Sequence, residues 1–170
     1  MDHFARPDDE LAVAQRNKQL QRNFQGYSTR AGSDIYSFGM SSISQIPDAY
    51  WQNEKGLPVY KEAVESGREP WHRAYFLTEE DTLRRDVIMR LMCDLSIDYA
   101  AASARLGVDF KQRFAPELAS LAPFLNDGLL ESSPTGLAVT DTGRLFIRNI
   151  AMCFDNTLPP AGERKYSKTV

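Results

Sequence analysis

The segment from residue 22 to 46 constrains the fold of this chain most, because it has the composition of two β-segments joined by a turn. The stretch 23–29 places aromatic residues around a glycine, and the stretch 35–46 mixes apolar residues with four serines around another glycine. Residues 30–34 have turn composition, so the sequence predicts an antiparallel β-pair. Glycine inside a strand often marks the close approach of a ligand or of another backbone segment. Serine hydroxyls beside aromatic rings suit a polar ligand with an apolar ring, although an ordinary half-buried sheet explains the same pattern.

Ser41 invites comparison with the nucleophile elbow of serine hydrolases, Gly-x-Ser-x-Gly. Here Gly39 and Ser41 occupy the first and third positions, but Ile43 stands where the second glycine is required. The sequence therefore does not indicate a serine hydrolase.

The chain around this β-pair reads as one helix before it and an irregular stretch after it. Pro7 and the acids that follow it predict the start of a helix that runs to about Leu20, since proline fits the first turn and acids are stabilised there by the helix dipole. Residues 47–78 are rich in proline and glycine and are expected to be irregular, with a short helix at about 60–66.

From residue 78 onward the sequence predicts a second, mostly helical domain. Thr78 and Asp81 form a variant capping box at the start of a helix with an apolar stripe that includes Leu83, Val87 and Leu91. The order of elements that follows is typical of a winged helix. The further predicted elements are helices at 99–106 and 111–125, a β-hairpin within 129–140 and a last helix at 141–154. The expected domains are 1–78 and 79–170.

Composition limits the classes of function open to this chain. Its 170 residues carry a net charge of −3, which argues against a general nucleic-acid or anionic-membrane binder. The helix at 111–125 carries too few basic residues for groove binding. The first residues lack the character of a signal peptide, and two unpatterned cysteines, Cys93 and Cys153, fit reduced thiols in a cytoplasmic protein. His3 and His72 lack partners at metal-ligand spacing.

Several blocks of sequence, matching in order and approximate spacing, resemble the oxygen-independent coproporphyrinogen III oxidase family. They are Met1 to Leu11, Arg22 to Tyr27 (Arg-Asn-Phe-Gln-Gly-Tyr), Arg84 to Ile88, Gly143 to Ile150 (Gly-Arg-Leu-Phe-Ile-Arg-Asn-Ile) and Met152 to Asp155. The resemblance covers nearly the whole chain up to Asn156, and it is to the C-terminal portion of that family only.

The resemblance implies an α+β fold: the C-terminal end of a radical S-adenosylmethionine (SAM) barrel-like domain in residues 1–78, and a winged-helix-like domain in residues 79–170. It also implies the cofactors SAM and [4Fe–4S] for the full-length enzyme, with the tetrapyrrole coproporphyrinogen III as substrate. The family's cluster motif, Cys-x3-Cys-x2-Cys, is absent from this chain, which is therefore expected to be a fragment without cluster ligands or catalytic residues of its own.

By position, the resemblance assigns Ile43 to the adenine of the cluster-bound SAM, and Phe24 and Gln25 to a second SAM pocket. The expected partners are the missing N-terminal catalytic half, SAM and the tetrapyrrole, with neither nucleic acid nor membrane, in a cytoplasmic monomer. Arg22 and Arg73 are chemically able to pair with propionates, although no sequence pattern places them near a tetrapyrrole. Two alternatives stay open: a non-catalytic winged-helix regulator or scaffold, and a heme-handling radical SAM relative.

Overall fold

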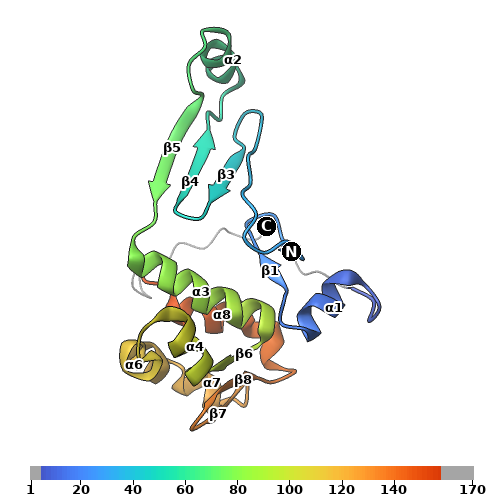
Figure 1. The fold of residues 1–170 in the computed structure, drawn as a ribbon, viewed down its shortest axis with the longest axis vertical. Helices are drawn as coiled ribbons and strands as arrows, with labels where there is room; N and C mark the ends of the chain where they lie inside the picture. The colour runs from blue at the N-terminus through green and yellow to red at the C-terminus, as the bar shows by residue number, and fades with distance from the viewer. Residues whose placement is uncertain (1–4, 158–170) are drawn as a thin grey trace. The chain divides into compact units, whose positions relative to one another are not determined.

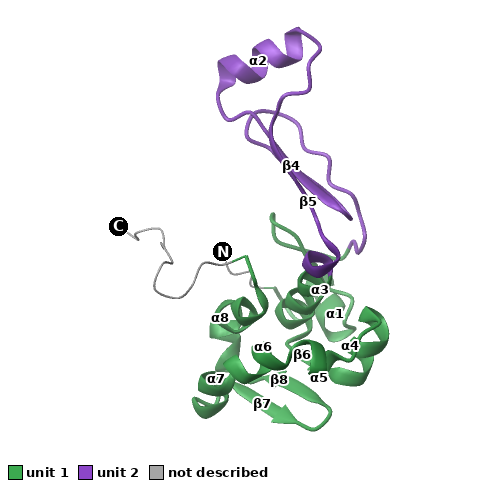
Figure 2. Ribbon diagram, turned by 90° about the vertical axis from the view of Figure 1, so that its left-hand side faces the viewer, with its two compact units in different colours: residues 1–29, 83–170 green, residues 30–82 purple. Residues whose placement is uncertain are grey.

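The computed structural model describes residues 5–157, which divide into two compact units (Figure 2). Unit 1 is built from the stretches before residue 30 and after residue 82, and unit 2 from residues 30–82 between them. The fold is α+β, with three small antiparallel sheets and no closed barrel among the described residues. Within this described part, no helix is both long and apolar enough to cross a membrane.

Unit 2 contains a three-stranded antiparallel sheet in the order β3-β4-β5, with a helix between its last two strands (Figure 1). Strands β3 and β4 pair directly because the tight turn at residues 47–48 joins Ile46 to Ala49. The elements are β3 (Ile43–Ile46), β4 (Ala49–Asn53), α2 (Leu57–Glu65) and β5 (Trp71–Phe76). Pro58 sits in the first turn of α2, where a missing N–H is harmless.

The predicted pairing of 23–29 with 35–46 is wrong. The first stretch lies in a separate hairpin, in which β1 (Gln21–Arg22) pairs with β2 (Tyr27–Ser28). The second stretch folds back on itself: Ile35 forms a single bridge to Gln45, and only Ile43–Ile46 is a strand. The reason is local, because Gly39 and Ser41 both adopt positive φ values, of 97° and 59°, which end an extended run.

The expectation that residues 47–78 are irregular is also wrong, because β4, α2 and β5 lie there. The short helix predicted within that stretch is present as α2 and starts three residues earlier than expected. Strand β5 is exposed along its whole length, so its sequence carries none of the apolar alternation that marks a half-buried strand.

The helices after residue 78 follow the predicted order, but the predicted helices 111–125 and 141–154 are each divided into three shorter pieces. The capping box is confirmed, since the Asp81 amide donates to the Thr78 hydroxyl (3.2 Å) and the Thr78 amide donates to the Asp81 carboxylate (2.9 Å). The predicted helix 111–125 is instead three short helices, and the second and third begin at Ala115 and Ala122 with Pro116 and Pro123 in their first turns. In order these elements are α3 (Glu79–Asp94), α4 (Tyr99–Leu106), α5 (Phe110–Arg113), α6 (Ala115–Ser120) and α7 (Ala122–Asn126).

Unit 1 also contains a three-stranded sheet in the order β6-β8-β7. Its strand β6, which lies between α3 and α4 in sequence, was not predicted. The strands are β6 (Ser96–Asp98), β7 (Leu130–Ser133) and β8 (Gly136–Val139). The last predicted helix is present as three consecutive turns, η1 (Gly143–Phe146), α8 (Ile147–Ala151) and η2 (Met152–Phe154). Gly143 is required here, because a Cβ at this position would lie 1.9 Å from the carbonyl oxygen of Leu129.

The core of unit 1 is a stack of aromatic side chains surrounded by aliphatic ones. Tyr99, Phe110, Phe114 and Phe154 are in successive ring contact, with centroids 5.5, 4.9 and 5.9 Å apart. The three phenylalanines are fully buried, together with Leu91 of α3. Such rings bury large apolar areas and fix the relative positions of the helices that carry them.

The N-terminal part of unit 1 docks on the C-terminal end of α3. It comprises α1 (Glu10–Arg16) and the β1–β2 hairpin. Side chains of this part donate to carbonyls that the helix end leaves unpaired: Gln15 to Cys93 (3.2 Å) and Tyr27 to Met92 (3.4 Å). A small cluster of Ala14, Leu20 and Cys93 is buried beneath them.

Candidate functional site

Phe24 and Gln25, both predicted site residues, occupy the turn between β1 and β2. The side chain of Asn23 organises this turn, because its oxygen accepts hydrogen bonds from the amides of Gln25 (2.8 Å) and Gly26 (3.1 Å). The turn closed by these hydrogen bonds leaves the side chains of Phe24 and Gln25 exposed, and 46% of the Phe24 surface is accessible to solvent. An open aromatic ring beside an amide side chain is a suitable surface for a ligand with an apolar face and a polar edge.

Ile43, the third predicted site residue, is the first residue of β3 and is half-buried. It lies opposite Gln52 of β4, and its carbonyl accepts a hydrogen bond from the Ser37 hydroxyl. The structure therefore brings Phe24 and Gln25 together on one turn of unit 1 and holds Ile43 in the sheet of unit 2.

The serines near Ile43 close a loop on itself. The Ser37 amide donates to the hydroxyl of Ser44 (3.0 Å), and the Ser42 hydroxyl donates to the Gly39 carbonyl (2.8 Å). Buried Asn53 donates to both the Gly39 carbonyl (3.0 Å) and the Ser42 hydroxyl (3.1 Å). The hydroxyls that suggested a ligand-lining strand thus satisfy the polar groups of a loop without regular structure.

The two cysteines do not form a metal site. An iron–sulfur cluster is held by three or four cysteine thiolates, and this chain has only Cys93 and Cys153, sixty residues apart in sequence. Among the described residues, no group of three potential metal ligands occurs. The residues present therefore do not fit an iron–sulfur cluster. His72 lies 3.5 Å from a Glu54 oxygen, and His3 falls outside the described residues.

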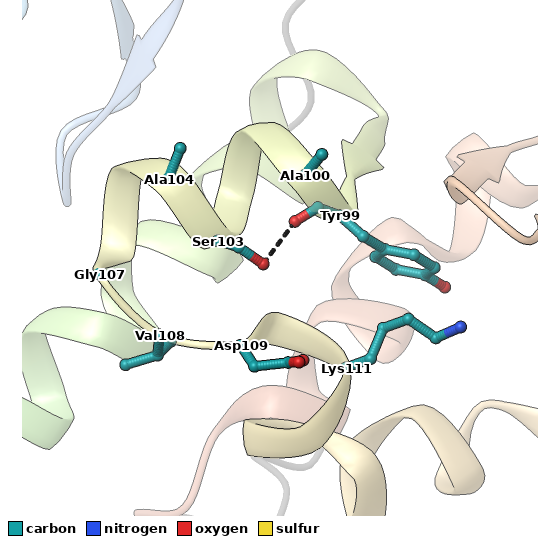
Figure 3. Close-up of a pocket in the computed structure, with 8 residues that line it drawn as sticks. All are labelled: Tyr99, Ala100, Ser103, Ala104, Gly107, Val108, Asp109 and Lys111. Carbon is teal, nitrogen blue, oxygen red and sulfur yellow. Dashed lines mark hydrogen bonds between the residues drawn. The ribbon is translucent and has the colours of Figure 1, made fainter.

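One open depression lies where α4 ends and α5 begins (Figure 3). The Ser103 hydroxyl donates to the Tyr99 carbonyl (2.7 Å) and accepts from the Phe110 amide (3.0 Å). The ammonium of Lys111 lies 5.7 Å from the centre of the Tyr99 ring. These polar groups hold the α4–α5 connection together, and Ala100 and Ala104 offer little for a ligand to recognise.

A second pocket, which sequence reasoning missed, combines arginines with apolar side chains. Its volume is about 350 Å3, and all residues that line it belong to unit 1. We call it the arginine pocket; its main lining residues are Arg22, Arg144, Arg148, Leu11, Leu20 and Leu145. The available signal was the four-residue spacing of Arg144 and Arg148, which puts both on one side of a helix.

Comparison with protein families matches residues 77–146 to the family described as the HemN C-terminal domain. The oxygen-independent coproporphyrinogen III oxidase of Salmonella typhimurium is 51% identical over 156 residues, which are 91% of this chain and 34% of that protein. The enzyme of the same name from Thermostichus vulcanus is 46% identical over 171 residues, covering the whole chain and 53% of that protein.

A solved structure agrees with these relatives. Coproporphyrinogen III oxidase (HemN) from Escherichia coli, described as a radical SAM enzyme, matches with a TM-score of 0.88 and 48% identity over 93% of this chain and 36% of that one. The chain spans about a third of the length of the Salmonella and Escherichia proteins. It is homologous, along nearly its full length, to the C-terminal portion of the oxygen-independent coproporphyrinogen III oxidases.

Proposed function

We propose that the chain is the C-terminal part of an oxygen-independent coproporphyrinogen III oxidase. The complete protein would oxidatively decarboxylate two propionates of coproporphyrinogen III to the vinyl groups of protoporphyrinogen IX, in heme biosynthesis. The observation that supports this most is the combination of 48% identity with a TM-score of 0.88 over 93% of the chain, because sequence and fold agree over the same residues. A lone fold match would not carry a function.

In this proposal residues 1–78 form the last part of the catalytic domain, and residues 79–170 form a winged-helix-like domain. The second assignment is supported by the order of α3, α4 and the α5–α7 segment, followed by the β7–β8 hairpin. By packing, the chain divides differently at its beginning, since residues before 30 belong with those after 82. The catalytic part therefore contributes the β1–β2 hairpin to the compact unit that holds the C-terminal helices.

Phe24, Gln25 and Ile43 are the residues of this chain that would bind SAM. The exposed ring of Phe24 is able to pack a flat heterocycle, and the exposed amide of Gln25 is able to donate and accept at its edge. Ile43 offers a β-branched apolar surface at the end of a strand. When bound, SAM and an iron–sulfur cluster supply the hydrogen-abstracting chemistry, and residues outside this chain would ligate the cluster.

The rival proposal, a winged-helix regulator that binds DNA, is supported less well. The segment expected to be the recognition helix carries two cations, Lys111 and Arg113, together with the acid Glu117, and is otherwise largely apolar. A groove-binding helix needs a run of cations for phosphates and base edges. No specific observation of the described residues favours the heme-handling relative.

A chimera tests the proposal. The C-terminal region of the Escherichia coli enzyme is replaced by this chain at the boundary of the structural match, and the chimera is expressed in a strain that lacks coproporphyrinogen III oxidases. We expect growth without added heme, and conversion of coproporphyrinogen III to protoporphyrinogen IX by the purified protein. The Escherichia coli enzyme cut at the same boundary is the negative control. A chimera that folds and holds its cofactors yet forms no product would refute the proposal.

A further inference from the structure

We propose that the arginine pocket binds those propionates of the tetrapyrrole that the reaction retains. This inference rests on the proposed function. Coproporphyrinogen III carries four propionates, and the reaction converts two of them to vinyl groups, so two carboxylates pass unchanged from substrate to product. The arginine pocket has the charge, the apolar surface and the size to hold that end of the macrocycle.

The charge of the pocket is unbalanced. Three of its lining residues are arginines, and no acidic residue lines it within the described part of the chain. The protein as a whole carries a net charge of −3. Guanidinium groups bind carboxylates through paired, charge-assisted hydrogen bonds. A pocket with this composition is therefore suited to a ligand that carries more than one carboxylate.

The arginines are not committed to strong partners within the described residues. The guanidinium of Arg22 lies 5.8 Å from the centre of the Tyr27 ring, which leaves its N–H groups available at the edge. Arg144 is 4.0 Å from Asp141, whose carboxylate is fully exposed, so this pair is weak. No ion pair of Arg148 is found in the described range. Like charges gathered in one pocket repel each other, and an anionic ligand removes that repulsion.

The apolar part of the pocket suits a ring system rather than a small anion. Leu11 and Leu20 come from the N-terminal part of unit 1, and Leu145, which is 83% exposed, comes from η1. Pockets for cofactor-sized ligands combine such apolar walls with a few polar groups that fix orientation. With a volume of about 350 Å3, the pocket accommodates one edge of a tetrapyrrole and not the whole macrocycle.

Three of the sequence blocks by which the chain resembles the oxidases contribute to the pocket, and two of these blocks supply its arginines. Arg22 and Tyr27 belong to the block Arg22 to Tyr27, and Arg144, Leu145 and Arg148 to the block Gly143 to Ile150. They lie more than a hundred residues apart in sequence and line one cavity. The proposed role explains why both blocks carry arginines that the SAM residues Phe24 and Gln25 do not require.

The chemistry favours retained propionates over reacting ones. Loss of CO2 from a propionate removes the charge of its carboxylate, so a site that stabilises this charge by several hydrogen bonds opposes the step. Two or three guanidiniums would bind the charged substrate better than the transition state for decarboxylation, which slows the reaction of the bound group. An arginine pocket thus protects the propionates that it binds and orients the others toward the reacting centre.

Binding of stable oxidised porphyrins to the 170-residue chain tests the inference. The probes are coproporphyrin III, with four propionates, deuteroporphyrin IX, with the two retained ones, and coproporphyrin III tetramethyl ester, with none. The variants are Arg144→Gln/Arg148→Gln, the charge-conserving Arg144→Lys/Arg148→Lys, and Arg22→Gln. The matched control is Lys61→Gln/Arg68→Gln, which removes two exposed cations from unit 2 whose partners are also exposed. Circular dichroism checks that each variant is folded. If a double variant does not fold, the single variant Arg22→Gln tests the pocket in its place.

We expect both acids to bind, the ester to bind weakly, and affinity for both acids to fall about tenfold in the double glutamine variant. The lysine variant should lie between, and the unit 2 control should stay within about twofold of the parent chain. Three results would overturn the inference: no binding of the acids by the parent chain, equal binding of acid and ester, or deuteroporphyrin IX affinity that is insensitive to the arginines.

The chimera separates this inference from the proposed function. An active chimera whose isolated C-terminal chain binds porphyrins independently of the arginines refutes the arginine pocket alone. An inactive, cofactor-loaded chimera combined with arginine-dependent porphyrin binding refutes the proposed function and leaves the carboxylate site standing.

Discussion

Replacing Arg84 by methionine should destabilise unit 1 by about 3–5 kcal/mol, the range for removing one partner of a buried ion pair. Arg84 lies 2.8 Å from Glu117, and their side chains are only 12% and 13% exposed. At an effective dielectric constant of about 20, their Coulomb attraction is about 6 kcal/mol, which the desolvation of both ions largely offsets. The second carboxylate oxygen of Glu117 is already buried without a hydrogen-bond partner among the described residues. Arg84→Met therefore leaves a buried carboxylate with little compensation.

The double variant Arg84→Met/Glu117→Leu should recover most of this loss and fall within about 1–2 kcal/mol of the parent, because two apolar side chains replace the pair without leaving a buried charge. The remaining deficit comes from the carbonyl of Phe154, which accepts a hydrogen bond from Arg84 (2.9 Å). The coupling between the two sites is then measured by a double-mutant cycle.

Urea denaturation followed by far-UV circular dichroism is the appropriate assay. Both tryptophans, Trp51 and Trp71, lie in unit 2, so their fluorescence reports on that unit, whereas most helical signal comes from unit 1. The reasoning is refuted if Arg84→Met costs less than about 1 kcal/mol, as a surface pair would, or if the double variant loses the sum of the two single effects.

Three further predictions concern single positions. Gly143→Ala should destabilise unit 1 by about 3 kcal/mol in chemical denaturation, because the new Cβ would lie 1.9 Å from the Leu129 carbonyl oxygen; a loss below about 1 kcal/mol would contradict the close approach. Burial raises the pKa of Cys93 from 9.0 to about 11, so the unfolded chain loses this proton first and stability falls as pH rises from 9.0 to about 11, by up to about 2 kcal/mol. Denaturation across that range should show a slope that Cys93→Ala removes, and iodoacetamide should alkylate native Cys153 before Cys93. In the chimera, Ile43→Asp should weaken SAM binding by about 1–3 kcal/mol, whereas Ile43→Val should change it by about 1 kcal/mol or less; unchanged SAM affinity in a folded aspartate variant would remove Ile43 from the site.

Features set by neighbouring residues could be predicted from the sequence. The helix predicted at 99–106 is α4 with the same bounds, because Asp98 caps its first turn and Gly107 ends it in the left-handed conformation. The Thr78–Asp81 capping box was predictable for the same reason. Pro116 and Pro123 could have revealed the breaks in the predicted helix 111–125, since each stands in the first turn of a new helix.

Features set by distant partners could not be predicted in the same way. Strand β6 has only three residues and exists through its pairing with β8, about forty positions later. The predicted β-pairing within residues 23–46 is wrong because two local features outweigh the apolar pattern. The Asn23 side chain accepts a hydrogen bond from the Gln25 amide and closes a turn there, and Ser41 has a positive φ that ends an extended run. The arginine pocket is the extreme case, since Arg22 and Arg148 meet only after the intervening chain has folded.

The discontinuity of unit 1 has a kinetic consequence. Before α1 and the β1–β2 hairpin reach the end of α3, the chain must close a loop formed by residues 30–82, and for a flexible loop of that length the entropic cost is about 3.5 kcal/mol plus a constant. The contacts that offset this cost are the small cluster around Ala14, Leu20 and Cys93, the hydrogen bonds from Gln15 and Tyr27 to the end of α3, and longer hydrogen bonds from Arg90 of α3 to the carbonyls of Lys18 and Leu20. The Arg22 amide also donates to the sulfur of Met89. The amides of α1 should therefore exchange with solvent deuterium sooner than those of α4, and the hairpin with its Phe24 turn should be the last part of unit 1 to dock.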